Sequence, residues 1–165
     1  DDTTATLTER LADLGADLLV EVLPRWLAGE IEPRPQDDAR ATYAPVISRQ
    51  DARIDWGRPV VEVDRLIRAY TPWPGAYTTV DGQMLKVVRA HPFGGEMGAV
   101  APGTVVAAGK EIGVQTGDGV LVLDVVQLAG RKAMDAVAFA HGRRGFVGSR
   151  LGREAAGRPQ AEVLP

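Results

Sequence analysis

The stretch AYTTVDGQMLKVVRA, residues 76–90, decides the fold of this 165-residue chain. Apolar and polar side chains alternate on both sides of Asp81-Gly82, and an Asp-Gly pair between two such runs is typical of a tight β-hairpin. Three more short runs follow, divided by glycine-rich turns: GTVVAAG at 103–109, IGVQT at 112–116 and VLVLDVVQL at 120–128. The pattern predicts a small barrel of five or six antiparallel strands between Ala76 and Gln127.

Helices are expected on both sides of these strands. Residues 58–70 carry an apolar face at helical spacing, formed by Val60, Val63, Leu66, Ile67 and Tyr70. Asp55 or Gly57 is the expected cap, and Pro59 suits the first turn. The prolines of TPWPGA, residues 71–76, end this helix because proline cannot continue it. A short helix around 135–142 would close the domain.

The first 29 residues form a separate amphipathic pattern. Apolar side chains recur every three or four positions, at Leu7, Leu11, Leu14, Leu18, Val22 and Trp26. Thr6 with Glu9 suggests a capping box, Gly29 an end, and Pro24 a kink or a break. Residues 30–41 have two prolines and few apolar side chains, which favours an extended linker. The expected division is a helix at 1–29, a linker at 30–41, a domain at 42–152 and a disordered tail at 153–165.

Composition excludes several classes of protein. Hydrophobic residues make up 45% and charged residues 25% of the chain, the balance of a globular protein. Cysteine is absent, which excludes disulfides and thiolate metal sites and suits the cytoplasm. The acidic start lacks the features of a secretory signal, and no apolar run approaches the roughly 18 residues of a membrane span. Because the first residue is Asp1, we expect a piece of a longer protein.

Charge is distributed unevenly along the chain. The net charge of −3 alone argues against nucleic-acid binding. However, residues 1–64 carry 7 basic and 14 acidic side chains, whereas residues 131–165 carry 7 basic and 3 acidic ones. Phosphate contacts depend on local basic patches, so the C-terminal part is a candidate for them; simple solvation of that end is the alternative.

The sequence offers no catalytic set. The two histidines, His91 in an expected loop and His141 near the end of the last helix, have no second ligand at metal-binding spacing. Ser48 and Ser149 lie outside any nucleophile motif, and residues 117–119 indicate a turn rather than a phosphate-binding loop. The tryptophans Trp56 and Trp73 are expected to pack in the core rather than stack on bases.

Six motifs in order carry a family resemblance: RPQDDARATYAP at 34–45, RIDW at 53–56, IRAYTPWPGAY at 67–77, PGTV at 102–105, QTGDGVLVL at 115–123 and LAGRKAM at 128–134. Together they resemble the C-terminal half of methionyl-tRNA formyltransferases, from about residue 2 to about residue 151. RIDW and the PGA motif also occur in formyltransferases that act on nucleotide sugars, whereas ATYAP with LAGRKAM points to the tRNA enzyme. The family's lysine after TYAP is Val46 here, and Arg49 lies close enough to substitute.

The resemblance implies a two-domain enzyme of translation initiation, found in the cytoplasm. Its N-terminal domain holds 10-formyltetrahydrofolate and an Asn–His–Asp catalytic set, whose motifs are absent here, so this chain alone is predicted to be inactive and to bind no cofactor. Residues 1–29 would be the last helix of that domain. The fold class implied is mainly β with flanking helices, an OB-like barrel that helps to hold initiator methionyl-tRNA.

The candidate tRNA contacts are basic residues at the C-terminal side, where family members tend to be basic: Arg143 and Arg144 after the last helix, and Arg131 and Lys132 after the last long strand. Arg49 and Arg68 are weaker candidates, since Arg68 can pair with Asp64. One alternative is the accessory barrel of a small-molecule formyltransferase, which contacts no nucleic acid. The two differ in whether the basic residues at 131–150 share a face. The other is an oligomerisation module that self-associates through residues 1–29.

Overall fold

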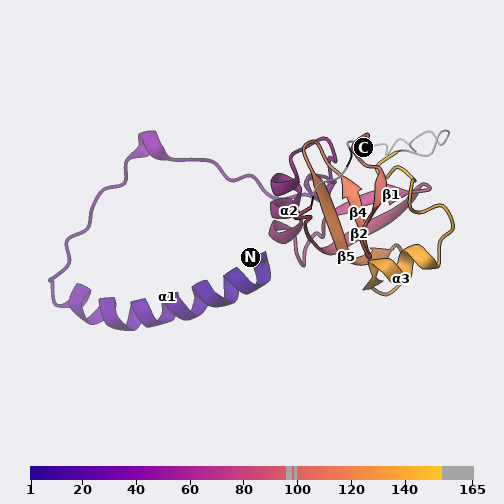
Figure 1. Cartoon of the computed structure of the whole chain (residues 1–165). Coiled ribbons are helices and arrows are strands. Elements are labelled where there is room, and N and C mark those ends of the chain that lie inside the picture. The colour runs from indigo at the N-terminus through magenta and orange to yellow at the C-terminus, as the bar shows by residue number, and fades with distance from the viewer. Residues whose placement is uncertain (96–97, 99, 154–165) are drawn as a thin grey trace, which may run out of the picture.

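The computed structural model describes residues 1–95, 98 and 100–153. In this part of the chain the centre is one antiparallel sheet, curled into a half-barrel, with strand order β1-β2-β5-β4-β3 and with β6 paired to β5 (Figure 1). The strands are β1 (Tyr77–Val80), β2 (Gln83–Pro92), β3 (Val105–Ala108), β4 (Glu111–Gln115), β5 (Val120–Leu128) and β6 (Met134–Asp135). The predicted fold class is confirmed, and the sixth strand lies just beyond the interval expected from the sequence.

Two local features shape the sheet. Asp81 and Gly82 have φ values of 47° and 75°, as a two-residue hairpin turn requires, and Val80 pairs with Gln83 across it. The pairing of β2 with β5 shifts register around Arg89, the mark of a β-bulge. A bulge bends its strand, and β2 pairs with β1 over residues 83–86 and with β5 over residues 85–92.

Helix α2 (Val60–Ala69) covers one side of the barrel and buries Val63 and Ile67. Its expected cap is wrong. The backbone N–H of Val60 donates to Asp118 Oδ1 at 2.7 Å, whereas the carboxylate of Asp55 accepts from the N–H of Gly57. The cap comes from the turn between β4 and β5, 58 residues along the chain, so no local pattern could reveal it.

Helix α3 (Ala136–His141) closes the barrel as predicted. Phe139 meets Phe146 edge to face, with ring centroids 5.0 Å apart. Trp56 is buried, as expected, and its indole N–H donates to Thr78 Oγ1 at 3.1 Å. The same expectation for Trp73 is wrong, because the turn between Pro72 and Pro74 leaves its side chain 59% exposed.

Helix α1 (Thr4–Leu27) stands away from the barrel, joined to it by an extended segment that contains the 3₁₀ turn Asp38–Arg40 (Figure 1). The helix is continuous through Pro24, so of the predicted kink or break the break is wrong, and the kink stays a prediction; Pro24 lies close enough to the end to interrupt little of the ladder. The cap is Thr3, which exchanges hydrogen bonds with Thr6, and not the predicted pair of Thr6 and Glu9.

Few contacts tie α1 to the rest of the described chain. Thr4 Oγ1 donates to the carbonyl of Ala69, and Arg68 Nη1 donates to the carbonyl of Asp2 at 3.1 Å. Both contacts involve α2 rather than the strands. The apolar stripe of α1 is exposed, from 43% at Leu7 to 63% at Leu14, apart from the half-buried Val22. Among the described residues, no helix is both long and apolar enough to cross a membrane. The tail expected beyond residue 153 lies outside the described residues.

Candidate nucleic-acid interface

Three C-terminal cations line a groove between the end of β5, β6 and α3. The groove has a volume of about 460 Å³ and is lined by Leu128, Arg131, Lys132, Ala133, Met134, Ala138, Phe139, Gly142 and Arg143. Arg131 and Lys132 are exposed. The turn that carries them is fixed by two hydrogen bonds, from Gln127 Nε2 to the carbonyl of Arg131 and from Arg131 N to the carbonyl of Leu128. The structure thus brings three of the predicted site residues together on an apolar floor.

Arg143 is held by two interactions within the chain. Its Nη2 lies 2.5 Å from Asp81 Oδ2, and its guanidinium carbon lies 5.9 Å from the ring centroid of Phe139. Its side chain is only 25% exposed. The neighbouring Arg144 is exposed and has no hydrogen bond or ion pair to any residue that the structure describes. Of the two predicted contacts, Arg143 and Arg144, only Arg144 therefore has a charge that no described acidic residue neutralises.

The two weaker candidates do not line this groove. Arg68 pairs with Asp64 through Nε and Nη2, at 3.0 and 2.9 Å, which is the alternative expected from their spacing. Arg49 is exposed beside a 3₁₀ turn, Gln50–Ala52. In that turn the backbone and hydroxyl groups of Ser48 donate to Asp51 and lower its pKa.

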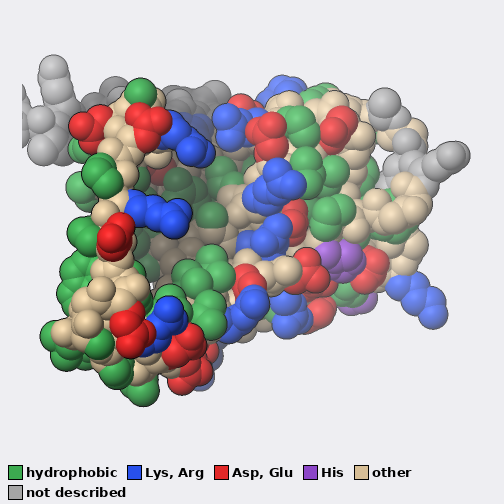
Figure 2. Space-filling view, turned by 90° about the vertical axis from the view of Figure 1, so that its left-hand side faces the viewer, with side chains coloured by type: hydrophobic (Ala, Val, Ile, Leu, Met, Phe, Trp, Pro, Cys, Tyr) green, Lys and Arg blue, Asp and Glu red, His purple; other side chains and the backbone are tan. Residues whose placement is uncertain are grey.

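Charge on the α1 and α2 side is mixed. Figure 2 shows that lysine and arginine side chains on this face alternate with acidic ones, so no patch of one sign forms there. Arg58 pairs with Glu62, and Arg89 with Asp124, in agreement with that pattern. This side is a poorer phosphate surface than the groove, because several of its cations already pair with an acidic neighbour.

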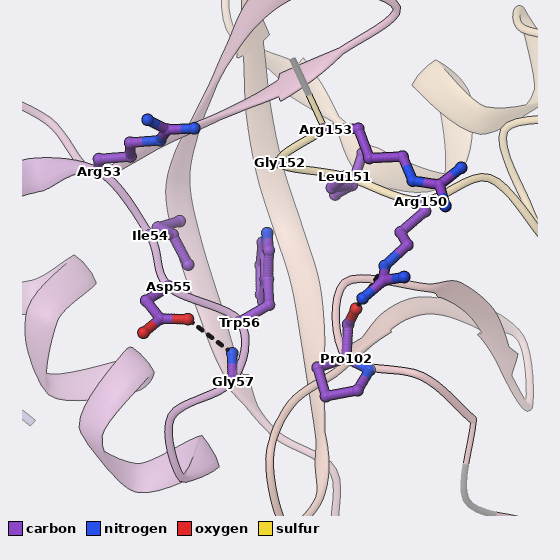
Figure 3. Close-up of a pocket in the computed structure, with 10 residues that line it drawn as sticks. All are labelled: Arg53, Ile54, Asp55, Trp56, Gly57, Pro102, Arg150, Leu151, Gly152 and Arg153. Carbon is purple, nitrogen blue, oxygen red and sulfur yellow. Dashed lines mark hydrogen bonds between the residues drawn. The ribbon is translucent and has the colours of Figure 1, made fainter. Parts of the chain in front are cut away.

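A second pocket, of about 710 Å³, was not predicted (Figure 3). We call it the arginine pocket; it is lined by Arg53, Ile54, Asp55, Trp56, Gly57, Pro102, Arg150, Leu151, Gly152 and Arg153. Two of its walls contain the RIDW and PGTV motifs. The third wall is the segment after α3. No local sequence pattern predicts that this segment returns to the barrel.

Among the described residues, no group of three or more acidic, histidine or cysteine side chains is placed to hold a metal ion. His91 lies in β2, not in the loop that the adjacent proline suggested, and its Nδ1 lies 3.2 Å from Asp124. The sequence contains no asparagine, so an Asn–His–Asp set cannot be assembled from this chain.

Comparison with known proteins identifies the class to which this fold belongs. Residues 46–144 match the family described as "Formyl transferase, C-terminal domain", and the chain belongs to this family. The solved structure of HypX from Aquifex aeolicus superposes with a TM-score of 0.60 over 84% of this chain and 26% of that one. At 20% identity this likeness concerns the fold alone.

Closer relatives share a more particular name. Proteins called methionyl-tRNA formyltransferase are 43% identical to this chain in Roseiflexus castenholzii, 45% in Myxococcus xanthus and 47% in Chloroflexus aurantiacus. The matches cover 92%, 90% and 82% of this chain and 49%, 47% and 44% of those proteins. The chain thus spans about half the length of the curated relatives it matches, and the resemblance found in the sequence is confirmed.

Proposed function

We propose that this chain is the tRNA-binding portion of a methionyl-tRNA formyltransferase and holds the sugar–phosphate backbone of initiator methionyl-tRNA. The observation that carries the proposal is the groove, where Arg131, Lys132 and Arg143 lie together around a floor of apolar side chains. Relatives named for the tRNA enzyme, at 43–47% identity, support the choice of substrate. The protein would act in the cytoplasm, where translation begins.

Each segment of the chain has a different proposed role. Residues 1–29 would be the last helix of the formyl-transferring domain, 30–41 a linker and 42–152 the OB-like domain. The formyl donor, 10-formyltetrahydrofolate, would be bound by the half of the relatives that this chain does not span, together with the catalytic set. Neither pocket offers an asparagine or a histidine for such chemistry.

The groove suits a phosphate backbone rather than base recognition. Arg131, Lys132 and Arg144 project into solvent, and long flexible cations at a surface neutralise phosphates without reading sequence. Arg143 contributes differently, because Asp81 and Phe139 fix its guanidinium at the edge of the groove. The rim would therefore orient the tRNA while the catalytic domain reaches the amino acid at its end.

The alternative is a barrel that only supports a small-molecule formyltransferase. HypX shares the fold at 20% identity, a likeness that does not distinguish the two functions. The position of the cations favours the tRNA enzyme, although not every basic residue of 131–150 lies at the groove. Arg131, Lys132 and Arg143 line one groove, whereas Arg150 lines the arginine pocket.

Charge reversal at the rim tests the proposal. Fluorescence anisotropy with labelled initiator tRNA would compare the wild-type chain, the double variant Arg131→Glu/Lys132→Glu and the control Arg65→Glu. Arg65 is an exposed arginine of α2 that lines neither pocket. We expect the double variant to bind at least about tenfold more weakly, because hydrogen bonds to charged groups contribute on the order of 1.5–3 kcal/mol. Equal affinity for all three proteins would refute the assignment.

A further inference from the structure

The turn between α2 and β1 presents an exposed tryptophan on a fixed backbone. Trp73 is 59% exposed and lies between Pro72 and Pro74, whose rings fix φ at both positions. Gly75 N donates to the carbonyl of Tyr70 at 2.9 Å, and this bond closes the turn. The indole of Trp73 forms neither a hydrogen bond nor a ring contact with any residue that the structure describes. Its face is therefore available to a ligand.

Lys86 binds this turn from the neighbouring strand. Its Nζ donates to the carbonyl of Pro74 at 3.2 Å, and its side chain lies against Gly75, where an added Cβ would meet Nζ at 3.2 Å. No acidic residue in the described part of the chain pairs with Lys86. An ammonium group has three donors, so two of them can still reach a ligand beside Trp73.

A shallow depression connects Lys86 to the groove. It has a volume of about 160 Å³ and is lined by Met84, Lys86, Gln127, Leu128, Ala129 and Gly130. Leu128 also lines the groove, so the two hollows share a wall. Lys86 pairs with Gln127 in the ladder of β2 and β5, and Gln127 Nε2 donates to the carbonyl of Arg131. Neighbouring strands lie about 4.8 Å apart, so only this pair of residues separates the turn of Trp73 from the turn of Arg131.

The lining of the groove and the depression carries charge of one sign. Among the described residues that line them, four are basic, Lys86, Arg131, Lys132 and Arg143, and none is acidic. Such a surface attracts phosphates, and an exposed tryptophan at its end suits a nucleobase, because every base has a flat face that stacks on an aromatic ring. A protein that covered Trp73 would also bury the charge of Lys86, which is costly unless the protein supplies an acidic group.

We propose that Trp73 stacks on an unpaired base of the tRNA, while Lys86 contacts a phosphate between that base and the groove. This inference rests on the proposed function and extends its interface along β2. A tRNA has unpaired nucleotides in its loops and at its end, and unpaired bases can stack on aromatic side chains. Stacking tolerates every base, so it agrees with a groove that reads no sequence. The fixed turn favours binding, because less freedom is lost when its side chain is immobilised.

The salt dependence of binding separates the two contacts. Anisotropy titrations with labelled initiator tRNA at several salt concentrations would compare the wild-type chain with Trp73→Ala, Trp73→Phe, Lys86→Gln and the control Trp26→Ala. Trp26 is an exposed tryptophan of α1 that lines neither the groove nor the depression. Phenylalanine keeps a ring for stacking, and glutamine removes the charge but keeps a donor for the carbonyl of Pro74. Thermal melts show whether each variant keeps the fold.

We expect Trp73→Ala to weaken binding by about five- to a hundredfold at every salt concentration and to leave the salt slope unchanged, because stacking involves no charge. Trp73→Phe should lose less affinity than Trp73→Ala, and Trp26→Ala should bind like the wild-type chain. Lys86→Gln should lower the magnitude of the slope by about 0.7–0.9, the loss of one phosphate contact.

The groove variant Arg131→Glu/Lys132→Glu distinguishes a failure of this inference from a failure of the proposed function. If it weakens tRNA binding while Trp73→Ala binds like Trp26→Ala, the inference is overturned, the proposed function stands, and Trp73 serves another partner. If the wild-type chain binds no tRNA, or the groove variant binds as tightly as the wild-type chain, the proposed function fails and the inference fails with it.

Discussion

Asp81 competes with phosphate for Arg143, so removing its charge should strengthen tRNA binding. The substitution Asp81→Asn suits the backbone, because Asp81 has a φ of 47° and asparagine tolerates this left-handed conformation. The hairpin turn should survive, and only the ion pair to Arg143, 2.5 Å long, is lost. Arg143 stays over Phe139 and can then reach a phosphate of the backbone.

The magnitude follows from the exposure of the pair. Asp81 is 73% exposed, so the pair stabilises by no more than about 0.2–1 kcal/mol after screening by solvent. In the variant, tRNA binding no longer has to break this ion pair. The saved free energy corresponds to an affinity gain of up to about fivefold. One added phosphate contact should also steepen the salt dependence by about 0.7–0.9.

A double-mutant cycle isolates the effect. Anisotropy titrations with initiator tRNA at several salt concentrations would cover Asp81→Asn, Arg143→Ala and the combined variant. Asp13→Asn on α1 controls for the change in net charge, because Asp13 is exposed and does not line the groove. In the Arg143→Ala background, Asp81→Asn should no longer steepen the slope. An equal gain from Asp13→Asn, or no gain from Asp81→Asn, would refute the reasoning.

Three further outcomes are expected. Asp118→Ala removes the side-chain cap of α2 and should lower the free energy of unfolding in urea by about 0.5–2 kcal/mol, whereas Asp118→Asn should lose less; equal stability would contradict the cap. The exposed stripe of α1 should cause concentration-dependent association in light scattering, abolished by Leu11→Asp/Leu18→Asp, since burying one leucine stabilises by roughly 1.5–3 kcal/mol; a wild-type monomer at all concentrations would exclude this. The purified chain should transfer no formyl group to methionyl-tRNA, and measured turnover would show that its residues suffice for the chemistry.

Local patterns were sufficient for the elements of the fold. The alternation around Asp81-Gly82 predicted the first hairpin, and the helical spacing from Val60 to Ile67 predicted α2. One error occurred where a distant residue decides the local outcome, and others, such as the cap of α1, were local. The cap of α2 comes from Asp118, and Trp73 is exposed because the turn that holds it points away from the core.

The candidate site was predictable only in part, for the same reason. Arg131 and Lys132 could be proposed from their place after a long strand and in a shared motif. That Arg143 is held by Asp81 could not be proposed, because 62 residues separate them in the sequence. Nor could Arg150 and Arg153 be placed opposite Arg53, since this depends on how the segment after α3 returns to the barrel.

Three exposed cations are proposed to hold tRNA through its phosphates: Arg131 and Lys132 on the rim of the groove, and Arg144 next to the lining residue Arg143. The most direct measurement is the slope of log K against log salt for initiator tRNA, compared between the wild-type chain and the triple variant Arg131→Glu/Lys132→Glu/Arg144→Glu. Loss of three phosphate contacts should lower the magnitude of the slope by about 2–3 units. A slope and an affinity equal to those of the wild-type chain would contradict the claim.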